Sequence, residues 1–484
     1  PLEQLRPRPH RPLIFPLRSI QALFPPTMAM PSLFPLGLLL GLSSLLIGCN
    51  PTQLEHTPPP ATSDDNTLII WWERGYYLQE DEAFEALVAA WEAETGHQVD
   101  LVFIDQYDLL KKTENALQAG TAPDLMYAAL TDETLSARWA WEGALAEVSD
   151  VIEPVQQLYS PAALQASRYY NGTTQTQAFY TLPIHQQTTY LHYWQTLLDQ
   201  TQLRQQPIPD TWDAFWAFWQ QAQDDLRRQG QQDIYALGLP MSSEASDTHY
   251  AFEKVLDAYD VELWDDQGNL RQDDPTVRQG IAQALRWYTD LYKAGYVPPD
   301  AIDWENGTNN TRFLNQQTLM VVNPTLSIPA SQRENADIYQ RQIVTHGFPK
   351  EPDGEPLVPV VTVKQVVLFA QSPHLALAKD FLAYLIEPDH LGTYLETALG
   401  RYLPVMPTLS AAPFWNDASD PHVFSAIQQL KGDTKTNAQT VYLASASVWG
   451  TAIERVLVDG LSPEAATEEA WQRLVAIAQT HHRP

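Results

Sequence analysis

The chain has 484 residues, with 29 Lys and Arg against 59 Asp and Glu, so its formal net charge at pH 7 is −30. This charge disfavours nucleic acid and anionic lipid as partners, because both are themselves negative. Cys49 is the only cysteine, which excludes an internal disulfide and any Cys-based zinc or iron–sulfur site. The length suits two lobes of about 200 residues each better than one small core.

An apolar run from Leu33 to Ile47 comes directly before this cysteine. It is long enough for the core of a signal peptide and too short, with Gly and Pro inside it, for a comfortable membrane span. We therefore expect residues 1–48 to form an export signal. Within it, residues 1–27 are either a long n-region or an over-extended gene start, and they hold the available positive charges at Arg6, Arg8, Arg11 and Arg18.

The sequence from Leu46 to Cys49 resembles a bacterial lipobox. The resemblance implies a lipoprotein whose mature chain begins at a lipidated Cys49, and several acyl chains would hold it stably at a membrane. The alternative is an ordinary buried cysteine inside a helix. Residues 49–66 would then be a lipidated terminus and a flexible tether, because the segment has few bulky apolar residues and a Pro58–Pro60 run.

A β-α-β unit opens the folded part. Residues 67–72 and 99–104 are compact β-rich runs. Between them, Phe84, Leu87, Val88 and Trp91 recur at helical spacing, and Gly96 lies where a helix C-cap belongs. Two parallel strands need such a crossover helix. A further helix over 107–119, ending at Gly120, and a short strand over 123–127 extend the same pattern, so the fold class is α/β.

The remainder of the chain is mainly helical by its apolar spacing. Helices are predicted over 212–228, 246–259, 275–294, 376–386 and 462–480, and the clearest late strand lies over 361–370.

Several short motifs in this order resemble the substrate-binding proteins of ATP-driven carbohydrate importers, the class that includes maltose-binding protein. They are Trp71-Trp72 followed by Gly75-Tyr76, "AGTAPDLMY", "YTLPI", "IPDTWDAFW", "ALAKDFLAYLI" and "VWGTAIERVLVDGLSPEAA". The resemblance covers the chain from Thr67 onward. It implies a two-lobe periplasmic-binding-protein fold of type II, with lobe 1 at 67–183 plus 357–405 and lobe 2 at 184–356 plus 406–484. Hinge crossovers would join the lobes, the first of them at Tyr180–His185, and ligand would lie in the cleft between them.

A sugar presents hydroxyl groups and apolar C–H faces, so its site needs aromatic rings together with carboxylates and amides. Ligands of open α/β sheets bind beyond the carboxyl ends of the strands. This rule selects positions after the first and third strands: Trp72, Glu73, Arg74, Tyr76, Tyr77 and Tyr127. Asp124 is a further candidate as a hydroxyl acceptor. Position in the family adds Gln186, Gln187, Glu244, Asp247, Asn323 and Trp449.

Ordinary structural roles compete with these assignments. Trp71 fits a core position better than a ligand contact, whereas Trp72 alternates to the other face of the strand. Glu73 with Arg74 could be a solvated surface pair, and Asp124 after a proline is equally good as a turn residue. A second aromatic set has helical spacing and is predicted to pack in a core: Trp212, Phe215, Trp216 and Trp219.

The predicted function is therefore lipid-anchored capture of a carbohydrate, a disaccharide or oligosaccharide, for delivery to the permease of an importer. The predicted location is the outer face of the cytoplasmic membrane, and a monomer is expected. No Walker motif, catalytic residue, metal or cofactor is expected, so the ATPase would be another chain. The alternatives are a lipid-anchored solute sensor and a secreted carbohydrate-active enzyme, which would need two carboxylates flanking the bond. Thr325-Leu326 after Asn323-Pro324 lacks the aromatic residue often found there in maltose-binding relatives, which argues against maltodextrin specifically.

Overall fold

The structure is a computed structural model, and it describes residues 66–265, 270–432, 434–436 and 445–480. The expected export signal, Cys49 and nearly all of the expected tether lie outside the described residues.

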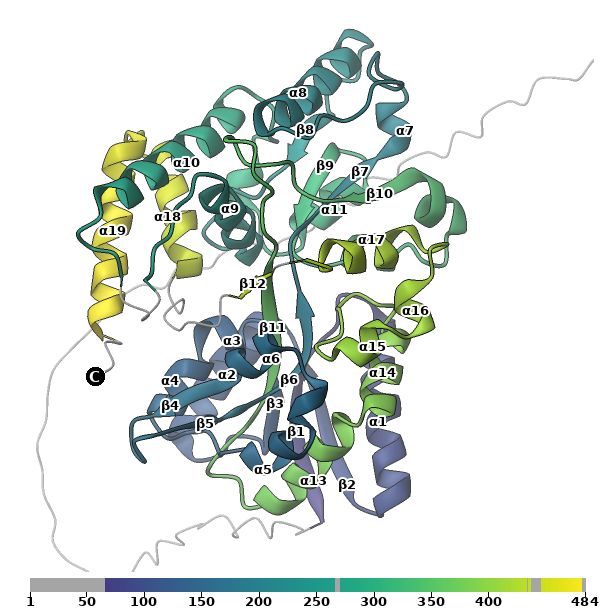
Figure 1. Cartoon of the computed structure of the whole chain (residues 1–484), viewed down its shortest axis with the longest axis vertical. Helices are drawn as coiled ribbons and strands as arrows, with labels where there is room; N and C mark the ends of the chain where they lie inside the picture. Colours follow the sequence, from purple (N-terminus) through teal and green to yellow (C-terminus); the bar gives the residue numbers. More distant parts are fainter. Residues whose placement is uncertain (1–65, 266–269, 433, 437–444, 481–484) are drawn as a thin grey trace, which may run out of the picture. The chain divides into compact units, whose positions relative to one another are not determined.

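The first sheet begins with the predicted β-α-β unit (Figure 1). Strand β1 (Thr67–Glu73) pairs in parallel with β2 (Gln98–Ile104) on one side and with β3 (Leu125–Tyr127) on the other. Helix α1 (Leu78–Thr95) connects β1 and β2 and buries the four predicted apolar residues. It ends at Gly96, whose φ of 77° lets its N–H bond to the carbonyl of Glu92. These predictions are confirmed.

Helices cover both faces of this sheet. On one face, the β1 side chains Leu68, Ile70 and Trp72 pack in a core with α1, α13 (Leu375–Leu385) and α14 (Pro388–Thr397). On the other face, Trp71 packs with α2 (Gln106–Ala119) and α4 (Ser136–Trp141). The period-2 alternation of a strand produces this division.

Strand β11 (Val360–Leu368) completes the first sheet from far along the chain. It runs antiparallel to β3 and to β6 (Thr181–Gln187), and parallel to β12 (Lys435–Thr436). The sheet order is therefore β12-β11-β3-β1-β2, with β6 also paired to β11.

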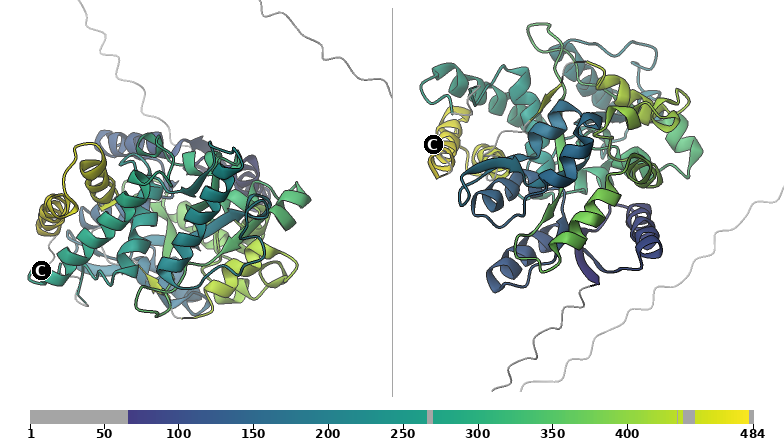
Figure 2. Two further views of the ribbon diagram at one scale, coloured as in Figure 1. Left: turned by 90° about the horizontal axis from the view of Figure 1, so that it is seen from above. Right: turned by 60° about the horizontal axis from the view of Figure 1, so that its bottom comes forward.

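A second sheet has the order β10-β7-β9-β8, formed by Ile343–His346, Tyr190–Trp194, Thr318–Asn323 and Tyr235–Gly238. Helices α8 (Trp212–Arg228), α9 (Ser246–Ala258) and α10 (Pro275–Lys293) pack around it. All four predicted core aromatics of α8 are buried. Figure 2 shows the late helices α18 (Ser445–Leu457) and α19 (Pro463–Thr480) side by side near the C-terminus.

The chain changes sheets between β6 and β7, at Thr188–Thr189, and again between β10 and β11. The predicted first crossover, Tyr180–His185, belongs almost entirely to β6 and therefore precedes this change by a few residues. The exact lobe boundaries stay a prediction.

Shorter elements connect these parts. In chain order they are α3 (Thr131–Thr134), α5 (Ser149–Ile152), η1 (Glu153–Leu158), α6 (Pro161–Ala166), β4 (Arg168–Asn171), β5 (Thr176–Phe179), α7 (Gln195–Leu198), η2 (Ala301–Asp303), α11 (Thr308–Leu314), α12 (Ser327–Ala330), η3 (Ile338–Gln342), α15 (Pro407–Ser410), α16 (Pro413–Asn416) and α17 (Pro421–Gln429).

Candidate functional site

A cavity of about 270 Å³ is lined by residues that come from both sheets. The first-sheet side contributes the segment after β1, the turn into α2, the residues after β3 and the end of β6. The second-sheet side contributes the start of α9, the start of α11 and the end of β9. The lining residues are Glu73, Arg74, Gly75, Tyr76, Asp105, Gln106, Tyr107, Ala129, Leu130, Gln187, Ser246, Asp247, Tyr250, Asn306, Gly307, Asn310, Asn323, Pro324, Thr325, Ser327, Arg401 and Tyr402.

The end of β1 places Glu73 at the cavity wall. Its Oε2 accepts a 2.6 Å hydrogen bond from the backbone N–H of Ala129, which follows the neighbouring strand β3. Burial raises the pKa of Glu73 to about 7, against smaller opposing effects of that hydrogen bond and of Arg401 and Lys364. Near neutral pH this carboxyl group can therefore both accept and, when protonated, donate a hydrogen bond.

Replacing Glu73 by glutamine is expected to flatten part of the pH dependence of stability. Between pH 4.5 and 7 the folded chain keeps a proton that the unfolded chain loses, so this stabilisation is complete at low pH and is lost as pH rises through about 7. The stabilisation that wild type loses over this pH range, and that Glu73→Gln lacks, should be about 1–3 kcal/mol. Denaturant unfolding at a series of pH values measures it, with exposed Glu82→Gln as control. Identical pH profiles for wild type and Glu73→Gln would contradict the assignment.

Arg401 and Tyr402 form a further part of the cavity wall. The Arg401 guanidinium bonds to both carboxylate oxygens of Glu80, at 2.9 and 2.7 Å, while its buried Nε has no protein partner. It lies 5.8 Å from the Tyr76 ring centroid and 4.5 Å from that of Tyr402. An unpaired buried N–H beside a cavity is available to a ligand oxygen.

A tight turn fixes the position of these two residues. Gly400 has a φ of +69°, and a Cβ at this position would lie 2.9 Å from the Phe414 ring. Gly400→Ala is therefore expected to cost about 2–3 kcal/mol of stability and to displace Arg401. Gly460→Ala is the matched control, because Gly460 has a φ of +73° and open space around it, so it reports backbone strain alone. Equal losses of stability for Gly400→Ala and Gly460→Ala in thermal unfolding would show that close contact with Phe414 adds nothing to the backbone strain.

The second-sheet wall is a network of amides and hydroxyls at the end of β9. Asn323 donates to Asn310 and accepts from the backbone N–H of Thr325 at 3.0 Å. The Asn310 amide also donates to Ser327 Oγ at 3.1 Å. The network holds these groups in fixed orientations, which is what recognition of hydroxyls in a fixed pattern requires.

Asp247 lies in the first turn of α9 and is buried. Its Oδ2 accepts a 2.7 Å hydrogen bond from the Asn309 amide, which also donates to the Val322 carbonyl at 3.2 Å. Asn309 therefore ties this carboxylate to the end of β9.

Tyrosines supply the aromatic surface of the cavity: Tyr76, Tyr107, Tyr250 and Tyr402. Tyr402 is backed by His185, with ring centroids 3.9 Å apart and nearly parallel planes. A tyrosine ring offers an apolar face and a hydroxyl at its edge, so it suits a ligand with both C–H faces and hydroxyls.

Hydrogen bonds join the two sides of the cavity. Tyr107 donates to the Glu244 carbonyl at 3.0 Å, and Asn306 donates to Gln106 at 3.1 Å. The buried Lys364, on β11, donates to the Tyr250 hydroxyl at 3.1 Å. The cavity walls are thus linked directly as well as through the chain crossovers.

Six of the thirteen predicted ligand residues line this cavity: Glu73, Arg74, Tyr76, Gln187, Asp247 and Asn323. The rule about strand ends selected those that follow β1, and position in the family selected Gln187, Asp247 and Asn323.

The other seven lie outside the cavity lining. Trp72 stacks on Phe84, with ring centroids 3.5 Å apart, and Trp449 packs against Phe252 in the second core. Asp124 accepts hydrogen bonds from the Ile69 N–H and from Ser372, so it has the structural role of a turn residue. The others bond to protein groups: Tyr77 to the Ala398 carbonyl, Tyr127 to His185, Gln186 to the Pro404 carbonyl, and Glu244 through its own carbonyl to Tyr107.

Several lining residues were missed by the sequence argument. Gln106 and Tyr107 follow β2, so the rule about strand ends would have selected them if applied to the second strand as well. Arg401, Tyr402 and Asn310 carry no comparable signal, because they lie outside strands and far along the chain from the first sheet.

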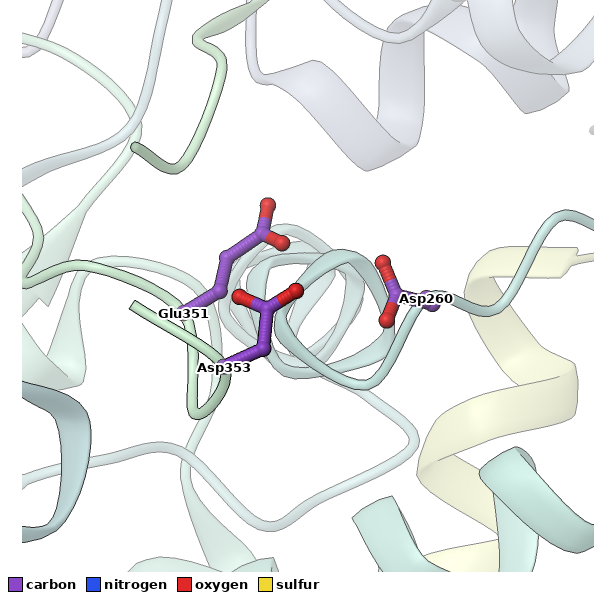
Figure 3. Close-up of side chains that lie close together, drawn as sticks. All are labelled: Asp260, Glu351 and Asp353. Carbon is purple, nitrogen blue, oxygen red and sulfur yellow. The ribbon is translucent and has the colours of Figure 1, made fainter. Parts of the chain in front are cut away.

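Three carboxylates elsewhere lie within 4.8 Å of one another, Asp260, Glu351 and Asp353 (Figure 3). They are exposed or half-buried, and such acidic groups are common without a metal ion. Within the described part of the chain, no helix combines the length and apolarity needed to cross a bilayer.

A family model described as bacterial extracellular solute-binding protein matches residues 86–425. The chain belongs to this family. Its members bind solutes outside the cytoplasm, so the prediction of a solute-binding protein rather than an enzyme is confirmed. A search of curated protein sequences gave no match.

Solved structures of similar fold confirm the predicted two-lobe α/β architecture. An ABC transporter solute-binding protein from Thermotoga lettingae bound with α-D-tagatose has 22% identity and a TM-score of 0.71, covering 85% of this chain and 99% of its own. Maltose-bound MalE3 of T. maritima has 14% identity and a TM-score of 0.68, covering 84% and 99%. The cyclic α-maltosyl-1,6-maltose binding protein of Arthrobacter globiformis has 18% identity and a TM-score of 0.65, covering 86% and 99%.

Proposed function

We propose that this solute-binding protein captures a carbohydrate and delivers it to the permease of an ABC importer whose ATPase is a separate chain. The observation that carries the proposal is the composition of the cavity, whose walls combine tyrosine rings with oriented amides and carboxylates. This combination matches the C–H faces and hydroxyls of a sugar. Structures of similar fold that bind tagatose and maltose support the proposal.

The size of the cavity favours a ligand of one or two sugar rings. Its volume of about 270 Å³ lies just below the range of about 300–1,000 Å³ that is typical of small-molecule sites. We assign ligand contact to Glu73, Tyr76, Gln187, Asp247 and Asn323, and we add Tyr107, Tyr250, Arg401 and Tyr402.

Closure on the ligand would drive delivery. A ligand that contacts both walls binds the closed form more tightly than the open form, and only such differential affinity can shift the population. The crossovers at Thr188–Thr189 and between β10 and β11 are where a hinge would act.

A lipid anchor on Cys49 would keep the protein, as a monomer, at the outer face of the cytoplasmic membrane, with residues 50–66 as its tether. Globomycin treatment of cells tests this part, because it blocks cleavage of lipoprotein signals. The wild-type protein should accumulate in its longer, uncleaved form in treated cells, whereas the size of the Cys49→Ala variant should not respond to the treatment. A wild-type protein whose size the treatment leaves unchanged would contradict the anchor.

The ligand assignment is tested by thermal unfolding of the full chain against mono-, di- and oligosaccharides at millimolar concentration, with each mixture analysed for cleavage products. A micromolar binder at thousandfold excess should add about 4 kcal/mol of apparent stability. We expect a shift with at least one sugar and recovery of that sugar intact. Stability unchanged by every sugar in the panel would overturn the carbohydrate assignment.

A further inference from the structure

The two basic residues of the cavity wall are already paired with carboxylates. Arg401 bonds to Glu80, and Arg74 lies 3.4 Å from Asp81. Neither arginine therefore presents an uncompensated positive charge to the cavity. The lining itself adds three acidic residues, Glu73, Asp105 and Asp247.

Two of these acidic residues, Asp105 and Asp247, lie near Tyr107. The Tyr107 hydroxyl donates to the Glu244 carbonyl, which places the turn into α2 against the segment before α9. Burial raises the pKa of the Tyr107 phenol, and four carboxylates raise it further: Asp247, Glu244, Asp105 and Glu305. Asp105 and Asp247 line the cavity from its two walls, whereas Glu244 and Glu305 are exposed residues outside its lining. The negative potential at this end therefore depends on the two walls being together.

This negative potential would strongly affect the binding of a charged ligand group. Charges interact more strongly in the low-dielectric surroundings of a protein cavity than in bulk water. An anionic group would be repelled, whereas a protonated amine would be attracted and would also donate hydrogen bonds to carboxylates. The interaction of a neutral hydroxyl with these carboxylates would be intermediate in strength.

We propose that the carboxylates around Tyr107 make the site selective by charge, so that it favours an amino sugar over the neutral sugar of the same ring and rejects acidic or phosphorylated sugars. This inference rests on the proposed function and narrows its class of ligand. Asp247 and Asp105 are the specificity-determining residues, because they line the cavity from opposite walls.

The test compares ligands that differ only in charge. The ring is that of the tightest binder in the sugar panel; for glucose the ligands are D-glucose, D-glucosamine, 6-amino-6-deoxy-D-glucose and D-glucuronate. Dissociation constants are measured by calorimetry on the full chain at pH 7.5 and low salt. We expect one amine to bind about fivefold or more tighter than the neutral sugar, and the carboxylate about fivefold or more weaker, with both differences shrinking in 0.5 M salt.

Two variants link the selectivity to its residues. Asp105→Asn removes a charge but keeps the helix cap, since Asn caps as well as Asp. Asp247→Asn removes the charge at the start of α9. In both variants the affinity for the amine divided by the affinity for the carboxylate should come closer to one. A general loss of structure would weaken both affinities without this change in their ratio. Asp213→Asn is the matched control, because Asp213 is an exposed acid in the first turn of α8.

The outcomes separate the two proposals. Sugar binding without this charge order, or with a ratio that both variants leave unchanged, would overturn the selectivity and leave the sugar assignment standing. Absence of binding by every sugar, neutral or charged, would overturn both.

Discussion

Replacing Arg401 by methionine is expected to lower the free energy of unfolding by about 3–5 kcal/mol, because it leaves Glu80 buried without its partner. Burial already raises the pKa of Glu80, and Arg401 opposes that rise. The loss should therefore shrink at acidic pH, where Glu80 can take up a proton. Denaturant unfolding at pH 5 and pH 8 measures both effects, and calorimetry should show weakened ligand binding.

Two comparisons isolate the buried pair. Arg286→Met breaks a surface pair with Glu464, in which both side chains are more than half exposed, and should cost less than about 1 kcal/mol. The double change Glu80→Gln with Arg401→Met should be less damaging than Arg401→Met alone, since no charge is left buried. An Arg401→Met variant as stable as Arg286→Met would show that the buried pair of Arg401 and Glu80 does not stabilise the protein.

Acid is expected to destabilise the protein through two buried histidines. The Thr345 hydroxyl lies 3.0 Å from His192 Nδ1 and 2.6 Å from His422 Nδ1, and His422 Nε2 lies 2.7 Å from the Tyr339 carbonyl. Burial lowers the pKa of His192 to about 3 and that of His422 to about 4. Both rings thus stay neutral in the fold, where they join β7, β10 and α17.

The sign of the effect follows from proton uptake by the unfolded chain. Below pH 6.5 the unfolded histidines bind protons that the folded ones do not, so the free energy of unfolding falls as pH falls toward 4. Each histidine contributes up to about 1.4 kcal/mol per pH unit. This trend is opposite to that of Glu73, whose contribution to stability grows as the pH falls over the same range.

The variant His422→Gln separates the histidine effect from other titrating groups. Its free energy of unfolding should fall less steeply between pH 6.5 and 4 than that of wild type, by about 1 kcal/mol per pH unit. The partly exposed His390→Gln serves as control and should leave the slope unchanged. Equal slopes of the free energy of unfolding against pH for wild type and His422→Gln would show that His422 does not contribute to the loss of stability in acid.

The sequence was sufficient where a local pattern decides the structure. Phe84, Leu87, Val88 and Trp91 defined a helix face, and Gly96 its end, because helix periodicity and capping act over a few residues. The family resemblance then indicated the two-lobe fold. Glu73 followed from the rule that ligands bind beyond strand ends, and Asn323 followed from its position in the family.

The missing part of the site depends on contacts that no local pattern encodes. Arg401 lies beside Tyr76 because a late turn at Gly400 packs on Phe414, and neither interaction has a periodic signal. Trp72 was a reasonable ligand candidate on alternation alone. It faces Phe84 instead, because the helix that follows β1 covers that face of the sheet.

Strand β11 also has a consequence for the timing of biosynthesis. β3 ends at Tyr127 and its neighbour β11 begins at Val360, so roughly 230 residues must be translated before the first sheet can be completed. At about 5–20 residues per second this takes about 10–50 s. During that interval an edge of β3 lacks its partner, and the emerging chain cannot reach its final fold. For a chain that is exported as we propose, this interval keeps it in the unfolded form that a secretion channel can thread.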